Sequence, residues 1–331
     1  MKVVFFQRRP YGSYVSVERV FAALRQALPE SVSSVVAVSS FISRGFWPRI
    51  YNIIEAAFRQ GDINHITGDV HYLAFLLDRK RTVLTILDLV AVHRLKGWKK
   101  SLFVFLWYSL PVSCVSRVTV ISEATKKDLL ATVKVNPAKV EVIYVPLSDD
   151  FFPSPRAFNS VKPIILQVGT ASNKNLERVA AALAGISCCL RIIGRLSEQQ
   201  KEALERADIE YSNVFHISDN QLVQEFRDCD MLVFASTFEG FGLPIIEAQA
   251  TGRPVVTSNL WSMPEVAGNA ACLVDPFDIS DIQKGVQRII SEDNYRSKLI
   301  ADGYVNVERF RLGRIAARYA QVYNDMLSAS K

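Results

Sequence analysis

The 331-residue sequence has only five cysteines and no long hydrophobic run, and both shortages exclude classes of protein. Five is an odd number, and no two of the cysteines have a metal-ligand spacing, so neither a disulfide framework nor a zinc site is expected. Reduced, buried thiols are the ordinary interpretation. The most apolar segment, residues 102–115, is too short to span a bilayer and contains Pro111. No internal repeat and no low-complexity segment is visible.

The amino terminus lacks the pattern of a cleavable signal. Met1 and Lys2 lead directly into Val3-Val4-Phe5-Phe6, which is typical of a β-strand and not of a signal peptide's apolar region. Together with the reduced thiols, this predicts a cytoplasmic protein. A peripheral position on the inner face of the plasma membrane stays open at this point.

Charge is distributed unevenly along the chain. Residues 1–160 carry 21 Lys and Arg against 12 Asp and Glu, whereas residues 161–331 carry 18 against 21. A basic first half favours an anionic partner at that end. No nucleic-acid-binding motif is recognisable, so nucleic acid is not an expected partner. An anionic membrane surface or a lipid-linked acceptor fits better.

Short apolar runs alternate with helical patterns along the whole chain. This alternation predicts an α/β protein with two doubly wound sheets, and the length suffices for two domains. Two histidines, His65 and His216, fall inside apolar strand patterns and are expected to be structural. From Asp278 onward the pattern is helical to the end, with a break expected at Gly303 and a long last helix over residues 310–327.

The most informative stretch runs from residue 234 to residue 276. It contains Glu239 and Glu247, with the glycine turn Gly240-Phe241-Gly242-Leu243 between them and Gly252 as a helix stop. A buried strand, a glycine loop and a helix place such carboxylates at the carboxyl end of the strand, where α/β sheets bind ligands. The helix start offers free N–H groups to an anion, and the carboxylates can accept hydrogen bonds from sugar hydroxyls. If the glycine turn is considered alone, the alternative to a ligand site is a tight turn whose glutamates are simply solvated.

Several motifs in this stretch follow one another in a recognisable order. E-G-F-G-L-P is followed by E-A, G-x-P-V-V, P-E-V and D-P, and this order resembles the signature of the retaining glycosyltransferases of family 4, which have the GT-B fold. The resemblance is highly specific over residues 234–276, moderate over 164–176 and loose over 1–150. It implies two Rossmann-like domains facing a central cleft. Their expected ranges are 1–155 for the acceptor side, 156–310 for nucleotide-sugar binding, and 311–331 for a helix that crosses back to the first domain.

The resemblance also implies a donor site. Glu239 would lie beside the donor sugar, Glu247 would bind the nucleotide ribose, and Lys174 in the V-G-x…K-N loop would contact the diphosphate. The donor-binding residues implied are Gly169, Thr170, Asn173, Lys174, Arg195, Glu239, Gly240, Phe241, Gly242, Leu243 and Glu247. Family members often carry an arginine close to the lysine, where this sequence has Thr170 and Asn173. Arg195 can compensate for that arginine or can be a surface residue.

The first half departs from the family pattern in one place. Family members often read T-x-H-D-L where this chain reads T-I-L-D-L, so Leu87 replaces the histidine while Asp88 is retained. His71 or His93 can supply an imidazole, and each can also be structural. The candidate catalytic residues are Glu239, Lys174, Asp88 and His71.

The loop after the first strand is the expected acceptor side. Its candidate residues are Arg8, Arg9, Tyr11 and Gly12, although a solvated basic turn also explains the arginines. Two other segments interleave basic and aromatic residues, around Trp47 and around Trp98. They suit a membrane interface, but an ordinary surface loop and a core helix with a basic cap explain them equally well.

The function implied by the resemblance is transfer of a sugar from a nucleotide-diphosphate sugar, UDP- or GDP-linked, to a saccharide or lipid-linked acceptor. The products would be polysaccharides or cell-envelope glycans. The family generally works without a metal, so neither a metal nor another cofactor is expected. Two alternatives stay open. One is a catalytically inactive scaffold protein on the transferase fold, marked by Leu87 and the missing arginine. The other is a nucleotide-sugar epimerase or hydrolase on the same fold.

Overall fold

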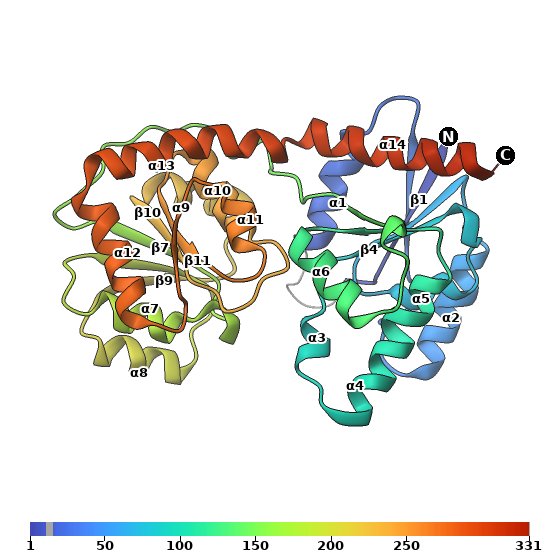
Figure 1. Ribbon diagram of the computed structural model, residues 1–331, viewed down its shortest axis with the longest axis horizontal. Helices are drawn as coiled ribbons and strands as arrows, with labels where there is room; N and C mark the ends of the chain where they lie inside the picture. The colour runs from blue at the N-terminus through green and yellow to red at the C-terminus, as the bar shows by residue number, and fades with distance from the viewer. Residues whose placement is uncertain (11–15, 331) are drawn as a thin grey trace. The chain divides into compact units, whose positions relative to one another are not determined.

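The computed structural model describes residues 1–10 and 16–330, which form two compact units (Figure 1). The N-terminal unit consists of Met1–Pro146 and Leu312–Lys331, and the C-terminal unit consists of Leu147–Arg311. Each unit holds one six-stranded sheet in which every strand pairing is parallel. The sequence-based prediction of two doubly wound sheets is therefore confirmed.

The sheet of the N-terminal unit has the order β2-β1-β3-β4-β5-β6. Its strands are β1 (Lys2–Gln7), β2 (Ser33–Val38), β3 (Ile63–Ile66), β4 (Thr82–Ile86), β5 (Arg117–Val120) and β6 (Val140–Val142). The inner strands β3 and β4 are buried along their whole length, as expected of parallel strands that are covered on both faces. The chain order reverses between β1 and β3, so the loops after these two strands meet at a topological switch point.

Helices cover both faces of this sheet. They are α1 (Ser16–Gln26), α2 (Phe46–Ala57), α3 (Val90–His93), α4 (Gly97–Val104), α5 (Leu110–Ser113), α6 (Glu123–Thr132) and α14 (Leu312–Ser330), with the short helices η1 (His71–Phe75), η2 (Arg79–Arg81) and η4 (Pro137–Lys139) and the π-helical turn η3 (Phe105–Ser109). The last helix, α14, packs with α1 on one face, where Tyr319 and Tyr323 join a core that includes Phe5 and Phe21. Residues from the two ends of the chain thus build one core.

The sheet of the C-terminal unit has the order β12-β11-β10-β7-β8-β9. Its strands are β7 (Ile164–Val168), β8 (Cys189–Ile193), β9 (Glu210–Val214), β10 (Met231–Phe234), β11 (Val255–Ser258) and β12 (Cys272–Val274). Its helices are α7 (Leu176–Leu183), α8 (Glu198–Arg206), α9 (Asp219–Asp228), α10 (Leu243–Thr251), α11 (Met263–Ala267), α12 (Ile279–Ser291) and α13 (Asp293–Asn306), with η5 (Ser172–Lys174) and η6 (Val307–Phe310). The chain order reverses between β7 and β10, which brings the loops after these strands together.

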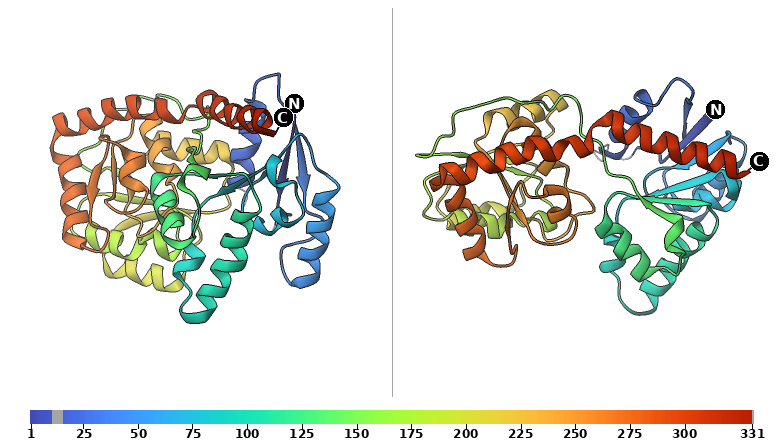
Figure 2. Two further views of the ribbon diagram at one scale, coloured as in Figure 1. Left: turned by 45° about the vertical axis from the view of Figure 1, so that its right-hand side comes forward. Right: turned by 45° about the horizontal axis from the view of Figure 1, so that its top comes forward.

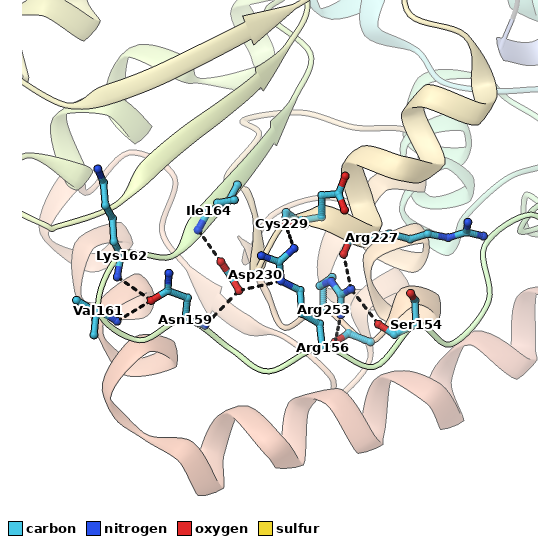
Figure 3. Close-up of polar contacts among 12 residues, drawn as sticks. Ser154, Arg156, Asn159, Val161, Lys162, Ile164, Arg227, Cys229, Asp230 and Arg253 are labelled. Atoms are coloured by element: carbon cyan, nitrogen blue, oxygen red, sulfur yellow. Dashed lines mark hydrogen bonds and ion pairs between the residues drawn. The ribbon is translucent and has the colours of Figure 1, made fainter.

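A buried arginine and a buried aspartate hold the irregular segment 147–163 against the C-terminal unit (Figure 3). The Arg253 guanidinium, 3% exposed, donates to the carbonyl oxygens of Ser154 at 2.9 Å, Arg227 at 2.7 Å and Phe226 at 3.1 Å. The Asp230 carboxylate accepts the N–H of Ile164 at 2.8 Å and pairs with Arg156, N to O, at 3.6 Å. The segment is therefore fixed by polar contacts, although it contains neither helix nor strand.

Two sequence-based expectations about local structure are wrong. His216 does not lie in a strand. Strand β9 ends at Val214, and His216 is exposed with a left-handed φ of 57°. Helix α13 also passes through Gly303 without a break. A side chain there would approach Gln249 Cβ to 3.2 Å, so Gly303 lets α13 pack closely on α10. The helical region is interrupted instead at Glu292 and Arg311.

The five cysteines are all free thiols, and Cys188, Cys229 and Cys272 are buried. Burial raises the pKa of the Cys229 thiol to about 12, so this group stays protonated at neutral pH. Among the helices of residues 1–10 and 16–330, none combines the length and the apolar character needed to cross a bilayer.

Candidate functional site

The candidate site lies at the switch point of the C-terminal sheet, where the loop after β7 meets the loop after β10. The backbone N–H of Thr237 donates to the carbonyl oxygen of Asn173 at 2.8 Å. In return, the Asn173 side-chain amide donates to the carbonyl oxygen of Phe238 at 2.9 Å. These reciprocal bonds fix the two loops side by side, at the edge where open α/β sheets bind ligands.

An ion pair stands at the centre of this junction. Lys174 Nζ lies 2.6 Å from Glu239 Oε1, and the Asn173 amide donates to the same oxygen at 3.2 Å. The ammonium also lies over the ring of Phe234, 4.6 Å from its centroid. Both charged side chains are largely but not fully buried, with 20% and 15% of their surface exposed. The structure thus brings together Lys174, Asn173 and Glu239 from the predicted donor-binding set.

The loop after β7 depends on two residues with left-handed backbone conformation. Gly169 has φ of 90°, and a side chain there would meet Lys174 Cε at 3.0 Å. Asn175 has φ of 62° just before α7, a conformation that asparagine tolerates better than most residues. The buried Asn175 amide donates to the carbonyl oxygens of Ala235 and Pro276 at 3.0 and 2.7 Å. This asparagine positions Lys174, a role that sequence reasoning missed. The available signal is the tolerance of asparagine for left-handed backbone.

Thr170 and Arg195 meet at the far side of the same loop. The Thr170 hydroxyl donates to the carbonyl oxygen of Arg195 at 2.8 Å. Gly194 leaves room for the Thr170 methyl group, because a side chain at position 194 would approach that methyl to 2.8 Å. The Arg195 side chain itself is exposed. The contact between these two predicted residues therefore runs through the Arg195 backbone.

The glycine turn leads directly into helix α10. Gly242, with φ of 105°, precedes the helix, and Pro244 occupies its first turn, where the missing N–H costs nothing. The Ser262 hydroxyl lies 2.9 Å from the carbonyl oxygen of Glu239 and 2.8 Å from that of Phe241, so it can bond with either. The Phe241 ring is buried against Phe310, with centroids 5.6 Å apart. Gly240, Gly242 and Leu243 thus belong to a turn held from both sides.

Glu247 lies one turn into α10 and has an unusual electrostatic environment. Desolvation by burial raises the pKa of its carboxyl to about 8, while the Lys174 ammonium lowers it and the Asp219 carboxylate raises it further. Glu247 keeps part of its surface exposed, and no hydrogen bond to its carboxylate oxygens is present in residues 1–10 and 16–330. Its carboxyl oxygens can therefore accept hydrogen bonds from hydroxyl groups of a ligand.

The candidate residues of the N-terminal unit form a separate group. The buried His71 ring is bonded through Nδ1 to the carbonyl oxygen of Trp107 at 2.9 Å and lies against Tyr108, with ring centroids 5.2 Å apart. The Tyr108 hydroxyl donates to the carbonyl oxygen of Asp88 at 3.3 Å. Burial lowers the pKa of His71, although Asp69 and Asp88 raise it again. Because its pKa is lowered, the His71 imidazole is neutral at neutral pH. His93 instead bonds Asp128 at 2.7 Å.

The acceptor-side arginines have protein partners. Arg8 pairs with Glu18 at 2.8 Å and with Asp69 at 3.4 Å, and Arg9 donates to the carbonyl oxygen of Ser40 at 2.6 Å. The Arg8 contacts join the loops after β1 and β3, so this residue stands at the switch point of the N-terminal sheet. Tyr11 and Gly12 lie outside the described residues.

The sequence contains one Asp-x-Asp motif, Asp228-Cys229-Asp230, which sequence reasoning overlooked. Carboxylates spaced in this way can hold a divalent cation. Here Asp228 accepts from the Gln224 amide at 2.9 Å, and Asp230 accepts from the backbone N–H of Ile164, so both carboxylates have structural partners. Across residues 1–10 and 16–330, no three His, Cys, Asp or Glu side chains gather as they would to hold a metal. The metal-independent reaction stays a prediction of the resemblance.

An aromatic pair beside Glu239 was also missed. The rings of Phe238 and Trp261 lie 4.4 Å apart, and Trp261 is 40% exposed with a strained φ of 55°. Left-handed backbone at a bulky residue persists only where the surrounding structure imposes it, and it occurs often at ligand sites. A left-handed backbone at tryptophan has no signal in the local residue pattern, so this pair was not predictable from the sequence.

Comparisons with known proteins agree with this geometry. Residues 148–305 match the family of glycosyl transferases group 1. The O-antigen chain mannosyltransferase B of Escherichia coli is 36% identical over 95 residues, which are 29% of this chain and 25% of that protein. The MMP alpha-(1->4)-mannosyltransferase of Mycolicibacterium hassiacum is 26% identical over 268 residues, which are 72% of this chain and 62% of that protein. The matches thus span between a quarter and about three fifths of these relatives.

A solved structure gives the fold. The Anabaena protein HepE, crystallised in complex with UDP and glucose, superimposes with a TM-score of 0.78 at 14% identity, covering 98% of this chain and 100% of that one. Two parallel sheets and this likeness define a GT-B glycosyltransferase fold. The expected GT-B fold is confirmed, and the expected resemblance agrees with the match of residues 148–305 to the group 1 glycosyl transferases. The retaining mechanism stays a prediction.

Proposed function

We propose that the protein is a retaining glycosyltransferase that moves a sugar from a nucleotide-diphosphate sugar to a saccharide or lipid-linked acceptor, in the synthesis of polysaccharide or cell-envelope glycan. The observation that carries this proposal is the ion pair of Lys174 and Glu239. It lies at the switch point of a sheet, within a segment that matches the group 1 family. A cytoplasmic site of action is part of the proposal and rests on the sequence pattern alone.

The donor is proposed to lie across three groups of the C-terminal unit. The diphosphate is bound by the Lys174 ammonium and by the positive end of the α10 helix dipole. The sugar lies beside Glu239, and the ribose hydroxyls are bound by Glu247. Lys174 is close to both carboxyl groups, since it pairs with Glu239 and lowers the pKa of Glu247. This closeness supports a single ligand that contacts all three.

Catalysis then consists mainly of positioning and charge stabilisation. As the bond from the sugar to the diphosphate breaks, negative charge grows on the departing phosphate oxygen and positive charge grows on the sugar. The ammonium of Lys174 and the start of α10 stabilise the first charge, and the Glu239 carboxylate stabilises the second. In the N-terminal unit, Asp88 and His71 are proposed to act on the acceptor side, where Arg8 and Arg9 bind the acceptor.

Mannose is the first sugar to test, because two of the similar proteins are named as mannosyltransferases. A UDP-linked donor is the first alternative, since HepE was crystallised with UDP and glucose. Either base is compatible with the residues named here.

Thermal-shift measurements with UDP, GDP, ADP and their common sugar conjugates test the proposal. A ligand that binds only the native state raises Tm, by an amount that corresponds to about 2.7 kcal/mol at a hundredfold excess over Kd. The expected result is a shift with one nucleotide in the wild type that is lost in Glu247→Ala. A shift without turnover on any acceptor favours the inactive scaffold instead. That alternative rests on Leu87 in place of histidine and on the absence of an arginine close to Lys174.

A further inference from the structure

The N-terminal unit exposes large apolar side chains along one face of helix α2. Phe46, Trp47, Tyr51, Ile54 and Phe58 recur at helical spacing, and Trp47 and Phe58 are 76% and 87% exposed. The opposite face of α2 packs on the sheet through Ile53 and Ala56. A surface helix normally presents polar residues on its outer face, so this apolar face is unusual.

The segment formed by α4 and η3 repeats the same arrangement. Trp98, Leu102, Phe105 and Leu106 lie at spacings of four, seven and eight residues from the first, and all four are exposed. No residue of α4 is buried. Phe103 and Val104 are half-buried against the core, whereas the other apolar side chains of the helix face solvent.

We call these exposed side chains of the two elements the aromatic face (Phe46, Trp47, Tyr51, Ile54, Phe58, Trp98, Leu102, Phe105 and Leu106). On their less exposed sides, α2 and η3 are in contact, because the Arg49 guanidinium lies over the Trp107 ring, 4.6 Å from its centroid. Figure 1 and the left view of Figure 2 both show α2 (light blue) and α4 (teal) projecting from the same end of the unit. An apolar hollow of about 410 Å³ lies on α2, lined by Phe41, Trp47, Pro48, Ile50, Tyr51 and Ile54.

Basic residues flank the aromatic face, and the sequence around it carries little acidic charge. Within residues 46–58 and 98–106 the only acidic residue is Glu55, which pairs with Arg59 at 2.7 Å. Arg94 at the end of α3 and Lys96 and Lys99 at the start of α4 are exposed. Within the described part of the chain, none of these three forms an ion pair. The face therefore combines apolar side chains with uncompensated positive charge.

We propose that the aromatic face docks this protein on the surface of an anionic phospholipid bilayer. The tryptophans and apolar side chains would lie at the boundary between headgroups and acyl chains, and Arg94, Lys96 and Lys99 would lie among the lipid phosphates. A second copy of this chain is a poorer partner, because an isologous contact brings the same positive charges together. The inference deepens the proposed function, since a lipid-linked acceptor is held at such a surface.

Vesicle flotation with the full chain tests this proposal. Wild-type protein should bind vesicles of phosphatidylglycerol, with affinity that falls as salt rises, and should bind phosphatidylcholine only weakly. The double variant Trp47→Ser/Trp98→Ser should lower the partition coefficient about tenfold or more, because two large apolar side chains no longer enter the interface. Arg94→Gln/Lys96→Gln/Lys99→Gln should lower it about a hundredfold on anionic vesicles at low salt.

A matched control removes equally exposed apolar side chains from the other unit. Val161 and Val305 are 80% and 73% exposed, and Val161→Ser/Val305→Ser should bind vesicles like the wild type. Equal loss in this control overturns the proposal, as does a wild type that does not bind anionic vesicles. A dimer that dissociates in Trp47→Ser/Trp98→Ser, without vesicle binding, assigns the face to a second copy. The nucleotide thermal shift is measured on the same samples, so that failure of membrane docking is distinguished from failure of the transferase proposal.

Discussion

Lys174 Nζ lies 2.6 Å from Glu239 Oε1, so the cation expected at the donor diphosphate and the carboxylate expected at the donor sugar form one ion pair. The two residues are 65 positions apart and come from loops that follow different strands. Each charge compensates the other in a site where both are largely desolvated. A donor that binds both groups must therefore enter between them or beside them, and the pair positions the charges before it arrives.

The first prediction concerns this pair. We expect Lys174→Ala and Glu239→Gln each to lower kcat/KM by about a hundredfold or more, because each removes a charge that acts on the transition state. Steady-state turnover with the donor identified by thermal shift gives the measurement. The matched control is Lys162→Ala, which breaks an exposed ion pair with Glu210, also 2.6 Å long, in the same unit. It should leave turnover unchanged, whereas full activity in Lys174→Ala contradicts the assignment.

The second prediction concerns the stability effect of Glu247. Its folded pKa of about 8 lies above the ordinary glutamate value, so the native state holds a proton that the unfolded chain releases. The stability of the wild type should therefore fall as pH rises from about 4.5 to about 8. Glu247→Gln keeps the shape without the charge and should raise the free energy of unfolding at pH 8.5 by about 2 kcal/mol, with little change at pH 5.

Urea unfolding at the two pH values measures this effect, and Glu202→Gln on an exposed position of α8 is the control. The control should show no pH-dependent gain. An equal gain for Glu247→Gln at both pH values would place the cause outside the titration of this carboxyl. The same variant should lose nucleotide binding, so a gain in stability accompanied by a loss of ligand separates the two roles of Glu247.

Much of the candidate site was predictable because its signals are local. The turn over residues 240–243 requires glycine at a positive φ, and Pro244 and Gly252 mark the start and end of the helix that follows. Alternating strand and helix patterns likewise suffice for two parallel sheets. These features depend on residues that are neighbours in the sequence.

The remaining features depend on contacts between distant segments. Gly303 has the local pattern of a helix break, but its missing side chain lets α13 pack on Gln249 of α10. His216 follows an apolar pattern, yet β9 is an edge strand that ends at Val214, so tertiary position overrides the local pattern. The strained Trp261 beside Phe238 depends on the surrounding loops in the same way.

The third prediction concerns the buried guanidinium of Arg253. Its bonds to backbone carbonyl oxygens join the segment 147–163, α9 and the start of β11, as Figure 3 shows. Arg253→Met removes these bonds and leaves buried carbonyls without donors, which costs about 3 kcal/mol or more. Chemical unfolding of the full chain should show this loss. Arg206→Met, on an exposed position of α8, should change stability by less than about 0.5 kcal/mol.

The fourth prediction concerns the attachment of α14 to the N-terminal sheet. His65 Nδ1 lies 2.7 Å from the Tyr323 hydroxyl, and His65 Nε2 lies 2.7 Å from the Thr85 hydroxyl. Desolvation lowers the pKa of His65 to about 3, so the ring is neutral in the folded protein at neutral pH. The two ends of the chain are thus joined through one buried, neutral imidazole.

Because the folded pKa of His65 lies below its ordinary value of about 6.5, its contribution to stability is complete above pH 6.5 and falls as pH drops toward 3. Tyr323→Phe should lower the free energy of unfolding by about 1–3 kcal/mol at pH 7.5, since the imidazole loses a buried partner. His65→Gln should also destabilise the protein at pH 7.5 but should flatten the decline between pH 6.5 and 4, because the amide does not titrate. Urea unfolding across this pH range measures both effects, with Asn324→Ala on the exposed face of α14 as the control. A decline in His65→Gln as steep as in the wild type would assign the acid sensitivity to groups other than this histidine.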